Sequence, residues 1–161
     1  MPVDPRDKSL LARAVALSRE HMEQGAGGPF GAVIASTNGR IIAEGWNCVT
    51  SQNDPTAHAE ITAIRRACET IGSFDLAGHV IYSSCEPCPM CLAAIYWARL
   101  ERLVFANSRD EAAAIGFDDA AIYAEIPKPL SQRSIPTLHQ PSDEAARVFA
   151  DWLKKPDRVE Y

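Results

Sequence analysis

The chain has 161 residues, of which 47% are hydrophobic and 23% are charged. This ordinary composition excludes collagen-like, low-complexity and disordered proteins, and the length predicts a single domain over residues 1–161 with a sizeable core. The 16 Lys and Arg residues against 21 Asp and Glu residues give a net charge of −5, so we expect neither nucleic acid nor a membrane surface as a partner. Residues 1–17 lack the basic and then apolar regions of a signal peptide, which predicts a cytoplasmic location.

Periodic apolar residues and turn dipeptides divide the chain into short elements. Residues 7–23 repeat apolar side chains at three- and four-residue intervals, as an amphipathic helix does. Asn38-Gly39 is a strong hairpin signal between two β-rich runs, which should therefore pair antiparallel. In chain order, the sequence predicts helices over residues 7–23, 58–71, 88–99, 110–115, 119–125 and 142–153, and strands over residues 30–36, 40–46, 79–84 and 102–106.

The later strands alternate with helices, and this order predicts crossover connections. Such connections place strands parallel, so the sheet should be mixed, with helices on both faces, in a three-layer α/β/α fold. Pro127, Pro129 and Pro136 stiffen the segment before the last helix and exclude a regular helix there. Residues 127–161 therefore form a C-terminal segment that either folds back on its own chain or exchanges with a neighbouring copy.

Chemistry-bearing residues gather at the starts of two predicted helices, in the sequences HAE at residues 58–60 and PCPMC at residues 87–91. Cys88 and Cys91 are three positions apart, so both lie on one helix face and can hold one ion. Residues two apart in a helix point about 200° apart, so His58 and Glu60 must lie at the very start of their helix to serve one site. His58, Cys88 and Cys91 then leave the fourth tetrahedral position to water, as catalytic zinc sites do, and Glu60 is expected beside it as the proton shuttle. The combination H-x-E with P-C-x-x-C is the known signature of zinc deaminases.

Two other interpretations of these cysteines remain open. The C-x-x-C spacing also occurs in dithiol redox pairs. Cys85 would complete a closed His/Cys₃ site, and because structural zinc fills all four positions, the protein would then be a non-catalytic scaffold. The five cysteines are an odd number, and three of them fall within residues 85–91, which favours metal or thiol chemistry in a reducing compartment over a disulfide framework.

The sequence resembles the cytidine deaminase superfamily, and within it more closely the small bacterial guanine deaminases. The resemblance rests on GGPFGAVI (27–34), NDPTAHAE (53–60), SCEPCPMCLAAIYWAR (84–99), GFDD (116–119) and the terminal Glu160-Tyr161. It implies the cytidine deaminase-like fold with a mixed five-stranded sheet, a Zn²⁺ cofactor, and hydrolysis of guanine to xanthine and ammonia in purine catabolism. Because HAE and PCxMC are shared with tRNA adenosine and cytosine deaminases, a deaminase of tRNA, cytosine or a nucleoside is the alternative.

The resemblance also implies which residues bind the base. Phe30 would stack on the purine, Asn47 would hydrogen-bond its edge, and the Ala59 backbone would help to hold it. Asp119 would recognise the N1–H and 2-amino donors of guanine and share the proton transfer with Glu60. Read from the residues alone, Phe30 is a core aromatic, Asn47 a turn residue and Asp119 a helix cap.

The family resemblance further implies a homodimer in which the C-terminal segment is exchanged between subunits. Tyr161 would then close the neighbouring chain's pocket, whereas its sequence position alone suggests a frayed end. Trp97 is either an interface aromatic or a wall of the pocket, and the sequence does not separate these two roles.

Overall fold

A computed structural model describes residues 4–161, which divide into two compact units, residues 4–119 and Ala120–Tyr161. The N-terminal unit comprises α1 (Pro5–Glu23), β1 (Gly31–Ser36), β2 (Ile41–Trp46), α2 (Val49–Gln52), α3 (Ala59–Ile71), β3 (His79–Cys85), α4 (Pro89–Trp97), β4 (Arg102–Asn107) and α5 (Arg109–Ala114). The C-terminal unit comprises α6 (Ala120–Glu125), the 3₁₀ turn η1 (Leu130–Gln132) and α7 (Asp143–Lys154).

The sheet has the strand order β2-β1-β3-β4 and is mixed. β1 pairs antiparallel with both β2 and β3, and the register of the first pair shifts between Ile34 and Ala35. β3 and β4 run parallel, since α4 connects them as a crossover. The predicted hairpin, the crossover and the mixed sheet are therefore confirmed.

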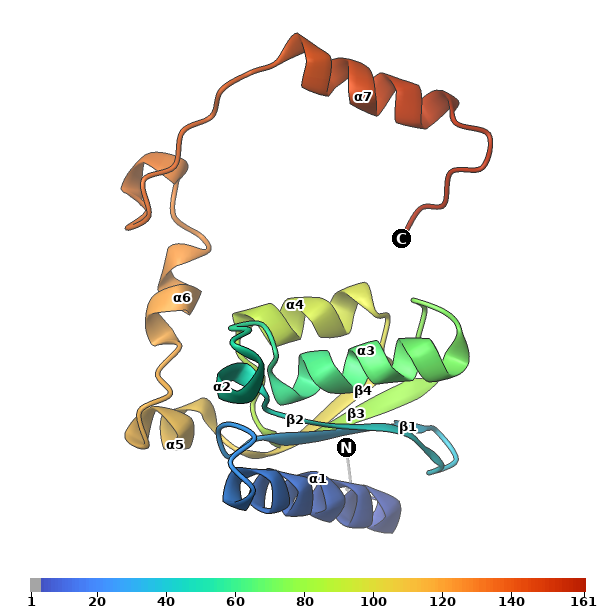
Figure 1. Cartoon of the computed structure of the whole chain (residues 1–161), viewed down its shortest axis with the longest axis vertical. Helices are drawn as coiled ribbons and strands as arrows, with labels where there is room; N and C mark the ends of the chain where they lie inside the picture. The colour runs from blue at the N-terminus through green and yellow to red at the C-terminus, as the bar shows by residue number, and fades with distance from the viewer. Residues whose placement is uncertain (1–3) are drawn as a thin grey trace. The chain divides into compact units, whose positions relative to one another are not determined.

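Helices cover both faces of the sheet, which gives the predicted three layers (Figure 1). α1 lies on one face, and α3 and α4 lie together on the other. Side chains alternate along β1, so Val33 and Ala35 pack against α1 while Ala32 and Ile34 pack against α3 and α4. Small residues line the inner side of α3 and allow the helix to approach the sheet closely: Ala59, Ala63 and Ala67.

The expectation of five strands is wrong, because the sheet of residues 4–161 has four. After β4 the chain enters α5, which Ser108 and Glu111 start with a reciprocal capping box. The prolines at 127 and 129 then lack the N–H that a sheet ladder needs. The sequence itself offered four strand-like runs, and the fifth strand had been expected from the family resemblance alone.

The C-terminal unit contains short helices joined by extended chain. α7 begins at Ser142, whose side chain accepts a hydrogen bond from the Ala145 amide, and neither α6 nor α7 contains a buried residue. The apolar stripe of α7 is exposed: Val148, Phe149, Trp152 and Leu153. Within residues 4–161 no helix combines the length and the apolar character that crossing a membrane requires.

A buried carboxylate ties α1 to strands β3 and β4. Asp7 is 2% exposed, accepts two hydrogen bonds from Arg102 at 2.8 and 2.7 Å, and accepts a third from the Tyr82 hydroxyl at 2.8 Å. The hydrogen bonds from Arg102 lower the pKa of Asp7 to about 2, and burial raises the pKa of Tyr82 to about 12. In the sequence, Tyr82 lies 75 positions and Arg102 lies 95 positions after Asp7.

Asp7→Asn is expected to lower the free energy of unfolding at pH 7 by about 1–2 kcal/mol, allowing for the partial exposure of Arg102. Because the folded-state pKa of Asp7 lies below its unfolded value of 3.8, this stabilisation is present above about pH 4 and is lost as the pH falls through about 2. Urea unfolding of both proteins between pH 7 and pH 2 measures the difference. Glu23→Gln, which removes an exposed ion pair, serves as the control; a difference that stays constant down to pH 2 would contradict this account.

Candidate metal centre and active site

Two helices on the same face of the sheet begin at the predicted metal ligands. His58 is the N-cap of α3 and Cys88 is the N-cap of α4, and both have extended backbone conformations. Pro89 follows as the first residue of α4, where its missing N–H costs no hydrogen bond. Glu60 lies in the first turn of α3, so the requirement that His58 and Glu60 occupy the start of a helix is met.

The three expected ligands come together in space. His58 Nδ1 lies 3.5 Å from Cys88 Sγ and 3.6 Å from Cys91 Sγ, and the three donor atoms lie within 4.8 Å of one another. A tetrahedral zinc ion with Zn–S of about 2.3 Å and Zn–N of about 2.05 Å separates its nitrogen and sulfur ligands by about 3.6 Å. One imidazole and two thiols at these separations therefore fit a zinc ion.

Electrostatics favour the thiolate form of Cys88. Hydrogen bonds from Cys91 and His58 lower the pKa of Cys88 to about 4, and contact with Cys88 raises the pKa of His58. The pKa of Cys91 is raised because its thiol donates to Cys88 and is buried. A divalent cation would replace the shared protons, since thiolates are the form that binds metal.

Glu60 provides a buried carboxyl group next to these ligands. Its side chain is 6% exposed, and burial raises its pKa. It interacts with Cys91 and accepts a hydrogen bond from the Ser83 hydroxyl at 3.0 Å. A carboxyl group with a raised pKa beside a three-ligand metal site is suited to proton transfer near neutral pH.

Asn47 and Ala59 are both buried in the N-terminal unit. The Asn47 Oδ1 atom accepts hydrogen bonds from the Gly28 and Val49 amides, each at 3.2 Å, so this side chain also fixes the loop before β1. Ala59 is the first residue of α3, where backbone N–H groups have no partner within the helix.

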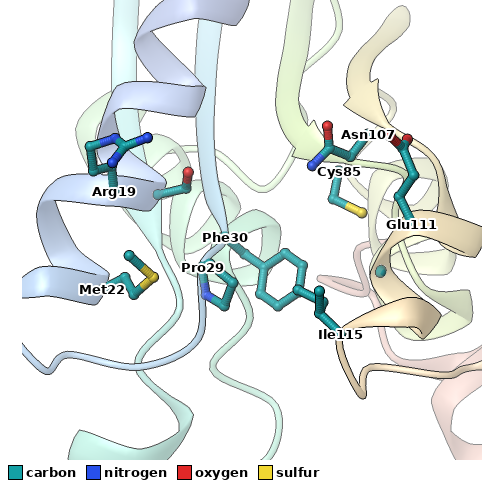
Figure 2. A pocket seen from close by; sticks show the side chains of 10 residues that line it. Arg19, Met22, Pro29, Phe30, Cys85, Asn107, Glu111 and Ile115 are labelled. Atoms are coloured by element: carbon teal, nitrogen blue, oxygen red, sulfur yellow. The ribbon is translucent and has the colours of Figure 1, made fainter.

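Phe30 joins the core on the α3 side and contacts Phe117 edge-to-face, with ring centroids 4.9 Å apart. It also lines a cavity of about 380 Å³ on the α1 side, between α1, the ends of β3 and β4, and α5 (Figure 2). The metal-ligating residues are not part of this cavity lining. Phe30 thus contacts both the α3-side core and this cavity, and its role in stacking on the base remains a prediction.

Cys85 belongs to this cavity and not to the metal ligands. Figure 2 shows its side chain among the lining residues, and its Sγ atom donates to the Ser108 carbonyl at 3.7 Å. Burial raises its pKa to about 11. Among the described residues, the group able to hold a metal contains His58 and two cysteines but not Cys85. This geometry contradicts the closed His/Cys₃ alternative.

The three remaining residues expected at the site, Asp119, Trp97 and Tyr161, differ in burial and position. Asp119 is partly buried, and burial together with the charge of Cys88 raises its pKa, which places it in the electrostatic environment of the metal ligands. Trp97 is 64% exposed at the C-terminal end of α4, about 12 Å along the helix from its start. Tyr161 is exposed and belongs to the C-terminal unit. The roles of Asp119, Trp97 and Tyr161 in binding the base remain predictions.

Sequence reasoning did not identify two residues that shape the site. A Cβ atom at Gly45 would lie 2.4 Å from the Ala59 carbonyl oxygen and 2.4 Å from the Ala63 amide, so only glycine lets β2 approach the start of α3 this closely. Ser83 holds Glu60. The available signals were a glycine inside a strand and a serine near the end of a strand, and neither identifies its partner.

Residues 4–107 match the family model for the cytidine and deoxycytidylate deaminase zinc-binding region. The chain belongs to this family. Among its members, the guanine deaminase of Bacillus subtilis (strain 168) is 50% identical over 154 residues, which cover 96% of this chain and 98% of that protein. The X-ray structure of guanine deaminase from Bacillus subtilis matches with a TM-score of 0.93 over the same shares of each chain.

Other family members match less of the chain. The tRNA-specific adenosine deaminase of Haemophilus influenzae is 45% identical over 96 residues, or 56% of each protein. A structure of guanine deaminase from Nitrosomonas europaea is 30% identical and covers 81% of this chain and 70% of that chain, with a TM-score of 0.68. The similarity to the Bacillus guanine deaminase therefore continues well beyond residue 107, where the family match ends.

Proposed function

We propose that this chain is a zinc-dependent guanine deaminase that hydrolyses guanine to xanthine and ammonia. The observation that carries the proposal is the buried Glu60 carboxyl beside a His/Cys/Cys set. Three such ligands would leave one position of a tetrahedral zinc ion to water. The near full-length likeness to a guanine deaminase supports guanine as the base, since it includes the part of the chain beyond residue 107.

His58, Cys88 and Cys91 would hold the zinc ion. When bound, zinc supplies a positive charge that lowers the pKa of water from ~15.7 to ~7 and so provides a nucleophile at neutral pH. Glu60 takes a proton from the attacking water and delivers it to N3 of the ring. It then takes the second proton from the new C2 hydroxyl, which becomes the C2 carbonyl of xanthine, and passes that proton to the departing amine. A C–O bond forms at C2, the C2–N bond breaks, and ammonia leaves.

The remaining residues orient the base. Phe30 offers a ring face for stacking, and the Asn47 amide group offers two donor hydrogens that suit the O6 and N7 acceptors of guanine. The Ala59 amide adds a donor at the start of α3. Asp119 accepts hydrogen bonds from N1–H and the 2-amino group, so a base without these donors would leave its carboxylate unpaired.

An ammonia-release assay on guanine, guanosine, adenine, cytosine and cytidine tests this proposal, with the zinc-loaded wild type and Glu60→Ala compared on each. We expect release from guanine by the wild type and none above background by the variant. Rapid release of ammonia from cytosine with none from guanine would make cytosine the substrate and would leave the proposed hydrolytic mechanism unchanged. No release from any base by a protein with full zinc content would overturn the proposal.

We further propose a homodimer in which residues 127–161 are exchanged and Tyr161 closes the partner's site. The exposed apolar stripe of α7 supports an exchange, since a helix with such a stripe is stable only when another surface covers it. β4 is an edge strand of the described sheet and can accept a further strand. Trp97, exposed on α4, remains a prediction as an interface or pocket aromatic, as does the cytoplasmic location.

A further inference from the structure

Ser83 is a buried hydroxyl on the strand that passes beneath α3. Side chains alternate along β3, so Tyr82 points to the α1 face while Ile81 packs on the α3 and α4 face. Ser83 shares the face of Ile81 and is 2% exposed. Its Oγ atom lies 3.0 Å from Oε1 of Glu60, and both side chains are buried.

A serine hydroxyl has one hydrogen, and its use decides what the carboxyl oxygens of Glu60 can do. The Cys85 amide lies 3.5 Å from Ser83 Oγ and donates to it. The hydroxyl hydrogen is therefore directed to Oε1, which acts as the acceptor of this bond. Glu60 also interacts with Cys91. With Oε1 held by Ser83, the second oxygen, Oε2, would be the one that takes up and releases protons.

We infer that Ser83 is a positioning residue for the proposed deamination: it holds Oε1 of Glu60 so that Oε2 carries the transferred proton. The inference rests on the proposed function of Glu60 as the proton shuttle. The terminal torsion of a glutamate is broad, so a carboxyl without such a bond samples several orientations. Proton transfer requires heavy-atom separations of about 2.6–3.2 Å, which a fixed carboxyl maintains.

Burial gives this bond its importance. No buried side-chain nitrogen or oxygen in the described part of the chain lacks a hydrogen-bond partner. Removing the Ser83 hydroxyl takes a donor from a carboxyl oxygen that water does not readily reach. Ser84 provides a contrast on the same strand, since its Oγ accepts a hydrogen bond from the Gly31 amide at 3.0 Å and, by the alternation along β3, its side chain lies on the face opposite to that of Ser83.

The test compares four variants of the full-length, zinc-loaded protein on whichever base of the panel the wild type deaminates fastest. Ser83→Ala is expected to lower kcat by about tenfold or more, with KM within about twofold, because the lost bond orients the proton shuttle and does not bind the base. Ser83→Thr, which keeps the hydroxyl, should restore kcat to within about threefold of the wild type. Ser83→Val, which has the shape of threonine without the hydroxyl, should remain as slow as Ser83→Ala.

Ser84→Ala removes a neighbouring buried hydroxyl and is the matched control, with kcat within about twofold of the wild type. Zinc content and thermal unfolding temperature are measured for all variants. An unchanged kcat in Ser83→Ala, or equal rates for the threonine and valine variants, would overturn the inference. Loss of folding in the alanine and valine variants alone would assign the hydroxyl to stability and also overturn it. A wild type that deaminates another base but not guanine changes the proposed substrate only, whereas no turnover on any base ends both proposals.

Discussion

Glu60→Gln is expected to lower kcat for deamination by about 10³- to 10⁴-fold while the protein keeps its zinc. Glutamine has the shape of glutamate and can still accept the hydrogen bond from Ser83, but its amide does not take up and release a proton. Because the proposed metal ligands are His58, Cys88 and Cys91, the substitution should remove proton transfer and leave metal binding intact. Ammonia release gives kcat, and elemental analysis of the purified protein gives the zinc content.

Glu69→Gln is a suitable control for this variant. Glu69 lies on the same helix, is exposed, and carries the same charge, so its replacement should leave kcat within about twofold. A Glu60→Gln enzyme that keeps more than a tenth of the wild-type kcat would show that another group moves the proton. Loss of zinc in this variant alone would instead make Glu60 a ligand and contradict the three-ligand site.

The elements that local sequence defines were predictable. The Asn-Gly turn specified the antiparallel pair of β1 and β2, and apolar periodicity located α1, α3 and α7 to within two residues at each end. The helical period also required the HAE sequence to lie at the start of a helix, because residues two apart cannot otherwise serve one site. His58 as the N-cap of α3 confirms this argument.

Long-range pairing accounts for most of what was not predicted. Asp7 resembles an ordinary acidic residue in a first helical turn, and only the fold brings Tyr82 and Arg102 to it. The bond between Ser83 and Glu60 likewise joins residues 23 positions apart. The four-residue helix α2 lies in a polar stretch with too few apolar residues to show a period. The prediction of a fifth strand was wrong for another reason, because no strand-like run after residue 107 supported it.

Co-expression of His58→Ala with Tyr161→Ala is expected to recover about a quarter of the wild-type activity from two poorly active parents. In a dimer with exchanged tails, the site with an intact His58 receives the intact Tyr161 of the other chain. Random pairing makes about half of the dimers mixed, and each mixed dimer has one complete site out of two. His58→Ala alone should be inactive because it lacks a metal ligand. Tyr161→Ala alone should lose about tenfold or more of its activity because its pocket is not closed.

The informative control pairs His58→Ala with Cys91→Ser. Both substitutions damage the same ligand set, so each site of a mixed dimer lacks one ligand and no recovery is expected with or without exchange. Two different affinity tags, purified in sequence, isolate the mixed dimers and remove the dependence on random pairing. If isolated His58→Ala/Tyr161→Ala dimers are as inactive as their parents, Tyr161 serves its own chain. If Tyr161→Ala alone is fully active, the tail does not close a site, and the exposed stripe of α7 must pack elsewhere.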